Sequence, residues 1–326
     1  MPIHTAIESA PSGVLFAVDA NGNELSDALH TESDADWVWV HLAQKSSDAR
    51  SWLLQEAGIP AAHARSMLED KVRPRCEVTE QGILFIGRGV NLDPTSVPED
   101  VVSLRAWVEE ERIITVVVRR LRSAETIAES FASSENRPSS PSELLALLFS
   151  QMVNRITPVV AELAEQLDDI QETVIDDDIP IADIKELSPV RLRAVTLHKY
   201  MTPMLDAANA LLSAKQVRSS ATIVDELTIT RDRLARAVEE LAAIDSRASV
   251  TRDEIISQRS DQLNQRVYVL TVLAGVCLPL SVLTGMLGMN VGGIPLTGDH
   301  GFIVTTLSML TVSGLTLAVL RLIKWI

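Results

Sequence analysis

The chain has 326 residues, a formal net charge of −15 and two cysteines, Cys76 and Cys277, which lie far apart. The acidic balance argues against nucleic acid as a partner and is compatible with cations, although excess acid also keeps a large domain soluble. Two isolated cysteines indicate neither a disulfide framework nor a thiolate metal site.

The first 140 residues predict an α+β domain, a mixed sheet with helices packed on it. β-branched and aromatic runs separated by turn signals predict strands, and the pair flanking Glu109-Glu110-Glu111 predicts a hairpin. Trp37 and Trp39 are two residues apart, so both rings should face the same side of a strand. The strands are expected at 14–18, 37–42, 82–86, 101–108 and 113–118, with short helices at 47–56 and 61–69.

A polar linker, residues 133–141, precedes a change to helical character, and helices at 141–219 are expected to pack on a later stalk. Ser142 is the predicted N-cap of a run to residue 175 that only Pro158 interrupts. Ser188-Pro189 predicts the N-cap and first position of a second helix, which reaches residue 213 and is kinked at Pro203.

A third helical run covers residues 220–287 and has no Gly or Pro until Gly275. Such a rod of roughly 65 residues would measure about 100 Å. It cannot bury an apolar stripe alone, so it needs the preceding helices, copies of itself, or both. The stripe repeats every seven residues, with Val238 and Ile244 on the same side: Leu227, Leu234, Leu241, Ala248 and Ile255.

Two uncharged apolar segments, 267–287 and 302–320, predict two transmembrane helices, the second ending near residue 322. The first would span about 31 Å, close to the thickness of a bilayer core. Arg266, Arg321 and Lys324 flank the pair, whereas the loop at 288–301 has no Lys or Arg. The positive-inside rule therefore places both termini in the cytoplasm and the loop outside, with Trp325 as an interfacial anchor.

The N-terminus has no basic segment followed by a long apolar one, so no signal peptide is expected. We therefore expect a multi-pass protein of the cytoplasmic (inner) membrane, with the bulk of the chain in the cytoplasm.

One face of the first segment mixes small and hydroxylated residues with aliphatic ones, at steps of three or four. Two interpretations remain open, a helix-packing face and a pore wall that passes hydrated ions, with rings such as Leu278 as gates. The candidate pore-lining residues are Asn264, Val267, Thr271, Ala274, Leu278, Ser281 and Gly285.

Gly288, Met289 and Asn290 stand where the first segment leaves the bilayer. The Asn290 amide offers a neutral carbonyl oxygen, and a ring of these can hydrogen-bond the hydration shell of a cation without stripping it. Mg²⁺ and similar ions dehydrate reluctantly, so such a filter suits them. The tripeptide is a weak signal alone, and its position makes it specific.

These features together resemble the CorA family of divalent-cation transporters, over the whole chain. The resemblance is narrower to its zinc transporter (ZntB) branch. The residues that carry it are Val291-Gly292-Gly293-Ile294-Pro295, Arg73-Pro74-Arg75, Tyr200 with Pro203, and Lys324-Trp325. Magnesium members usually carry an acidic loop where this chain has Gly292 to Pro295.

The resemblance implies a homopentameric funnel in which five first spans line the pore. It also implies a ring of five Asn290 side chains at the external mouth. Members of the zinc branch are associated with zinc uptake coupled to protons.

Several other clusters are weaker. Asp299 and His300 in the external loop are a candidate metal site, with an exposed loop as the default interpretation. An acidic cluster on a helix, Asp168, Asp169, Glu172 and Asp176, is either a cation sensor between subunits, as the resemblance implies, or a solvated face. His41, His63 and His198 have no metal-ligand spacing and are expected to be packing or surface residues.

No catalytic constellation occurs, so no enzyme and no cofactor are expected. The sequence predicts a homopentamer that transports divalent cations, Zn²⁺ first, with membrane lipids and no nucleic acid as partners. Alternative ions are Mg²⁺, Co²⁺, Ni²⁺ and Cd²⁺. One alternative is a magnesium, cobalt or nickel channel gated by intracellular cation, and another is a membrane-anchored oligomeric scaffold.

Overall fold

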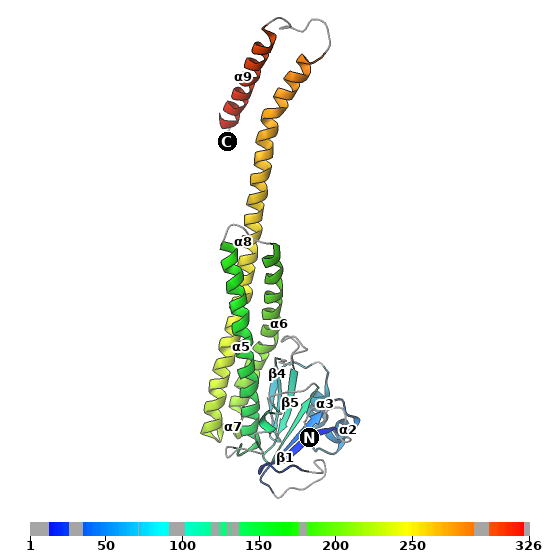
Figure 1. The fold of residues 1–326 in the computed structure, drawn as a ribbon. Coiled ribbons are helices and arrows are strands. Elements are labelled where there is room, and N and C mark those ends of the chain that lie inside the picture. The colour runs from blue at the N-terminus through cyan, green and yellow to red at the C-terminus, as the bar shows by residue number, and fades with distance from the viewer. Residues whose placement is uncertain are drawn as a thin grey trace. The chain divides into compact units, whose positions relative to one another are not determined.

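The computed structural model describes residues 13–25, 35–70, 72–90, 102–118, 124, 126–128, 131, 137–175, 181–289 and 300–322 (Figure 1). The chain divides into two compact units, Met1–Thr251 and Arg252–Ile326. One helix, α8 (Ala221–Leu287), runs from the first unit into the second.

The first unit contains a six-stranded mixed sheet in the order β1-β2-β6-β5-β4-β3. Neighbouring strands are antiparallel except β2 and β6, which pair in parallel with His41 opposite Thr115. Five of the strands, including the hairpin of β5 and β6, confirm the prediction, whereas β3 was not predicted. The bounds are β1 (Val14–Asp19), β2 (Val38–Ala43), β3 (Arg75–Val78), β4 (Ile83–Gly89), β5 (Val102–Val108) and β6 (Arg112–Val117).

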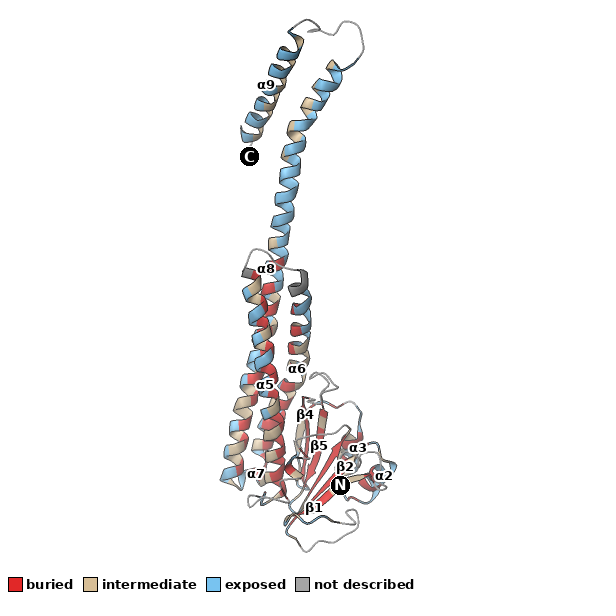
Figure 2. Ribbon diagram, viewed as in Figure 1, coloured by how far each residue is buried: buried red, intermediate tan, exposed pale blue. Residues whose placement is uncertain are grey.

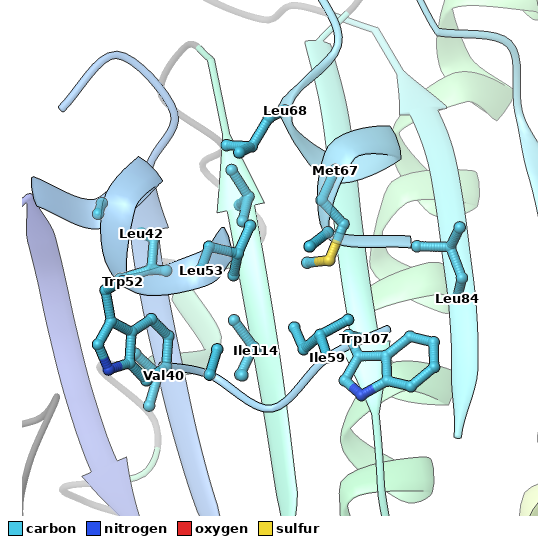
Figure 3. Close-up of a cluster of buried hydrophobic side chains, with 14 of the residues drawn as sticks. Val40, Leu42, Trp52, Leu53, Ile59, Met67, Leu68, Leu84, Trp107 and Ile114 are labelled. Carbon is cyan, nitrogen blue, oxygen red and sulfur yellow. The ribbon is translucent and has the colours of Figure 1, made fainter. Parts of the chain in front are cut away.

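Helices α2 (Ser47–Gln55) and α3 (Ala61–Leu68) cover one face of the sheet, as predicted. Ser46 caps α2 by accepting a hydrogen bond from the Ala49 N–H. Figure 3 shows Leu53 of α2 and Met67 of α3 above Ile114 and Trp107 of the strands. This face therefore forms an apolar core that is closed to water.

The other face of the sheet contacts α5 (Pro141–Ile175). Phe85 of β4 and Phe149 of α5 meet edge to face with their ring centroids 5.5 Å apart. Trp37 and Trp39 lie on one side of β2, as predicted, and both rings contact Phe131. The sheet is thus covered on both faces, as expected of an α+β layer structure.

The start of α5 differs from the prediction. The cap is Ser140 rather than Ser142, because the Ser140 hydroxyl accepts a hydrogen bond from the Glu143 N–H at 3.2 Å. The Glu143 carboxylate in turn accepts a bond from the Ser139 N–H at 2.7 Å. Pro141 takes the first helical position, where its missing N–H costs nothing, and Ser142 is buried.

The start of α6 (Ile181–Ser213) was also predicted wrongly. Ser188 and Pro189 lie inside this helix, together with Pro203, rather than at its beginning. Leu187 and Val190, on either side of the pair, are both buried, so packing of the flanking turns outweighs the hydrogen bond lost at proline. A single turn, α7 (Lys215–Arg218), follows.

The first part of α8 packs along α5 and α6, as Figure 2 shows by its buried positions. Gln171 of α5 donates a hydrogen bond to Thr251 of α8 at 2.8 Å, and Arg191 of α6 pairs with Asp245 of α8 at 2.7 Å. Val238 is only half-buried, and Ala237 is buried instead. The predicted heptad stripe is confirmed as buried: Leu227, Leu234, Leu241, Ala248, Ile255 and also Ile244.

The second unit contains the remainder of α8 and α9 (Gly301–Leu322). Three described helices are long and apolar enough to cross a membrane: α5, α8 and α9. More than half of the apolar window of α5, 56%, is buried inside the protein, whereas none of the windows of α8 and α9 is. α5 is therefore a core helix, and α8 and α9 are the candidate spans.

Candidate ion pathway

The predicted pore-lining face of α8 is open along its whole length. All seven residues, from Asn264 to Gly285, are exposed. The two largest apolar ones, Val267 and Leu278, are 60% and 70% exposed. Apolar side chains are rarely left in contact with water on this scale, so the face requires a covering of lipid or protein.

α9 of the same chain does not supply that covering. Half-buried positions of α8 lie on another side of the helix, and a Cβ on Gly275 would lie 4.0 Å from the Leu320 side chain of α9. At 3.6 residues per turn, the centres of the two stripes are roughly 140° apart. The half-buried stripe is Val272, Gly275, Val276, Pro279, Leu280, Leu283 and Leu287.

The hydroxyl groups of the open face already donate hydrogen bonds within α8. Thr271 donates to the Val267 carbonyl at 2.8 Å, and Ser281 donates to the Cys277 carbonyl at 2.9 Å. A hydroxyl with its proton engaged retains lone pairs that accept. These two hydroxyls can therefore present oxygen to a cation or to its hydration water without leaving their own donors unpaired in an apolar medium.

The structure describes Gly288 and Met289, the first two residues of the predicted Gly288-Met289-Asn290 filter. α8 ends at Leu287, and the Gly288 N–H donates to the Thr284 carbonyl at 2.8 Å. Met289 is 52% exposed. Asn290 and Asp299 lie outside the described residues, and His300 is exposed, with its carbonyl accepting from the Val304 N–H at the start of α9.

The predicted acidic cluster on α5 is divided between different surroundings. Asp168 forms an ion pair with Arg247 of α8, and Asp169 lies in a groove between α5 and α6 beside Lys185. Glu172 is exposed, and Asp176 lies outside the described residues. In the described part of one chain, no three His, Cys, Asp or Glu side chains are arranged to hold a metal ion.

His41 and His63 have packing roles in the first unit, as predicted. His41 is buried with its Nδ1 at 2.7 Å from the Thr115 hydroxyl, which also accepts from the Trp39 indole N–H at 2.8 Å. Burial lowers the pKa of His41 to about 3, so the imidazole is neutral. His63 stacks on Trp107 with centroids 5.0 Å apart, and its Nε2 lies 3.2 Å from Glu77.

Known proteins that this chain resembles are named as transporters of metal cations. The family model for the CorA-like Mg²⁺ transporter protein matches residues 34–322. The divalent cation transporter CmaX of Pseudomonas aeruginosa is 31% identical, over 95% of this chain and 92% of its own. The zinc transport protein ZntB of Pectobacterium atrosepticum is 27% identical, over 88% of each chain.

A solved structure supports the same class. The structure of the full-length CmaX protein aligns with a TM-score of 0.84 at 28% identity, covering 98% of this chain and 100% of that one. The fold and the matched length define a divalent-cation transporter rather than an enzyme. The chain belongs to the family of CorA-like Mg²⁺ transporter proteins.

Proposed function

We propose that this protein carries divalent metal cations, zinc first, through a homopentameric pore in a cytoplasmic membrane. The open face of α8 carries the proposal. It is exposed from Asn264 to Gly285, it does not face α9, and it holds no charged side chain. Five copies of this face around an axis would enclose a path without fixed charge, which suits an ion that keeps its water.

In this mechanism, a hydrated cation is captured by the carbonyl oxygens of five Asn290 side chains at the external mouth. It then passes the Ser281 and Thr271 oxygens, which accept hydrogen bonds from its water. Leu278, between these two levels, would form an apolar ring that closes the path by excluding water. The first unit would remain in the cytoplasm with both termini.

Zinc as the principal ion rests on two kinds of support. The sequence motifs around the Asn290 loop resemble the zinc branch, and a relative that matches 88% of the chain is named a zinc transport protein. The family model names Mg²⁺, and the CmaX relative is named only for divalent cations. A magnesium, cobalt or nickel channel gated by intracellular cation is therefore the second candidate.

Proton coupling is the finer part of the proposal. The spanning part of α8, residues 267–287, contains no Asp, Glu or His, and neither does α9. Proton relays inside membranes normally use such side chains. Coupling in this protein would therefore depend on a chain of water molecules along the open face, on groups in the loop at 288–301 or on cytoplasmic residues.

The test is uptake of Zn²⁺ and, in parallel, Mg²⁺ into proteoliposomes, with and without an inward proton gradient. Zinc uptake that rises with the gradient supports the full proposal, and magnesium uptake indifferent to pH selects the second candidate. Asn290→Ala should slow uptake roughly tenfold or more, equivalent to about 1.4 kcal/mol in the barrier. Absence of flux for both ions from folded, reconstituted protein would contradict transport altogether.

A further inference from the structure

Two arginines lie next to each other on one face of the sheet, far from the open face of α8 in sequence. β4 and β5 are antiparallel with Ile86 opposite Arg105 and Arg88 opposite Ser103. Directly paired residues share a face, and so do residues two apart on a strand. Arg88 and Arg105 are therefore diagonal neighbours, with Cα atoms about 7–8 Å apart.

Arg105 is completely buried, at 0% exposure. Its Nη2 donates to the carbonyl oxygen of Glu69, which follows the last turn of α3, at 2.6 Å. Gln44 also donates to Glu69, at 3.2 Å, and to Leu68, at 2.7 Å, so the end of α3 is well supplied with donors. Capping of α3 accounts for the hydrogen bond of Arg105 Nη2, but it gives no hydrogen-bond partner to Nε or Nη1.

Three nitrogen atoms of this pair, as far as the structure describes the chain, have no acceptor. The buried Nε and Nη1 of Arg105 and the buried Nε of Arg88 find no hydrogen-bond partner within the described ranges. The Arg88 guanidinium lies over the ring of Tyr200 on α6, 4.4 Å from its centre. That contact engages the flat side of the guanidinium and leaves its edge unused.

The charges of the pair are also unbalanced. No carboxylate in the described part of the chain forms an ion pair with Arg105 or Arg88. Burial and then the charge of Arg88 lower the pKa of Arg105 to about 10, with opposing contributions from the exposed Asp70 and Glu69. An arginine at that pKa keeps its charge at neutral pH, and a buried charge that no described carboxylate contacts directly is unfavourable.

We propose that Arg88 and Arg105 together bind a small inorganic anion between the sheet, the end of α3 and the Tyr200 side of α6. The N–H groups on the three unpaired nitrogen atoms supply its hydrogen bonds, and the two guanidinium charges supply its affinity. Chloride and inorganic phosphate share the required chemistry. The anion would act as a structural counter-ion of the first unit, and this role is independent of which cation the protein transports.

The first test is thermal unfolding of the full-length protein in detergent at constant ionic strength. Sodium gluconate, whose anion is bulky, is replaced stepwise by sodium chloride or sodium phosphate. A ligand that binds only the folded state raises the Tm in a saturable way, and a rise of several degrees is expected. A rise with one salt identifies that anion, and equal Tm values in all three salts would overturn the proposal.

Two variants make the first test specific. Arg88→Gln removes the unpaired Nε donor and one charge and should abolish the rise, whereas Arg65→Gln, at an exposed position of α3, should retain it. A rise that survives in Arg88→Gln would refute the site. If that variant does not fold, crystals of the wild-type protein grown in bromide without phosphate show whether an anion occupies the site. Anomalous density beside Arg105 Nε or Nη1 is the expected result, and a carboxylate of the chain in that place would refute it.

Discussion

The two parts of α8 differ in how far their leucine side chains are buried. In the first unit, Leu234 and Leu241 are fully buried against the protein, whereas in the second unit Leu273 and Leu278 are 59% and 70% exposed. Figure 2 shows the same contrast along α8, with buried positions in its first part and mostly exposed ones in its second. Both parts are regular helix, so the difference does not lie in backbone propensity. It lies in whether the covering is provided by α5 and α6 of the same chain or has to come from outside it.

This contrast explains how one helix can serve both a folded domain and a membrane. A heptad stripe flanked by charged residues satisfies the first part, and the mostly apolar, uncharged surface of residues 267–287 suits the second. The stability of the first part can therefore be measured in a single chain, while the function of the second depends on lipid and on further copies. Four changes would break or sharpen this comparison.

The largest effect is expected from a matched pair of leucine substitutions. Leu241→Ala leaves a cavity in the buried stripe and should cost about 3 kcal/mol of unfolding free energy, within the usual 2–5. Leu273→Ala makes the same change at an exposed site and should cost less than about 0.5 kcal/mol in detergent. Denaturant unfolding followed by tryptophan fluorescence measures both, because Trp37, Trp39, Trp52 and Trp107 report on the first unit. Equal losses would contradict the contrast.

A pH effect confined to the first unit comes next. His41 has a folded pKa of about 3, against 6.5 for the unfolded imidazole, so the unfolded chain binds more protons between these values. Stability should therefore be complete above pH 6.5 and fall as the pH is lowered toward 3, by at most about 1.4 kcal/mol per unit. His41→Gln should flatten the dependence of unfolding free energy on pH between 7 and 5. An unchanged slope would exclude His41 as its source.

The proposed pore face can be tested with two identical substitutions. Thr271 lies on the open face and Thr284 lies off it, and both hydroxyls donate to helix carbonyls. Thr271→Val removes a pore oxygen and should slow zinc uptake in proteoliposomes several-fold, whereas Thr284→Val should leave the rate unchanged. If both variants slow uptake equally, the open face is a packing surface rather than a wall of the pore.

The smallest effect is expected where α5 meets α8 at the surface. Asp168 is 61% exposed in its ion pair with Arg247, so the solvent screens most of the attraction. A double-mutant cycle with Asp168→Asn and Arg247→Gln should give a coupling below about 1 kcal/mol that decreases in high salt. A larger coupling, insensitive to salt, would identify this pair as a latch between the helices.

Most of the fold could be predicted because its signals are local and periodic. The buried repeat from Leu227 to Ile255 marks one face of a helix without reference to any partner. β3 was missed because Arg75, Cys76, Glu77 and Val78 form a short edge strand with little apolar alternation. The parallel pairing of β2 with β6 was not predictable either, because it joins segments that are distant in the chain.

The candidate functional residues also differ in whether they could be found from the sequence. The spacing of the seven α8 residues places them on one face, and all seven are exposed, but their role in lining a pore stays a prediction. Arg88 and Arg105 escaped the sequence analysis because an arginine in a strand usually reaches solvent with its charged end. Only the tertiary structure reveals that Arg105 is buried and that its donors lack acceptors.

The parallel pairing of β2 with β6 has a consequence for biosynthesis. β2 first meets β1, and the edge of β2 that later receives β6 stays open until a segment 74 residues further along the chain has emerged, the separation between His41 and Thr115. That edge belongs to a strand with Trp39, Val40 and Leu42, which makes it a template for mispairing with other nascent chains. Ribosome-associated chaperones should therefore matter most while β3, β4 and β5 are being translated.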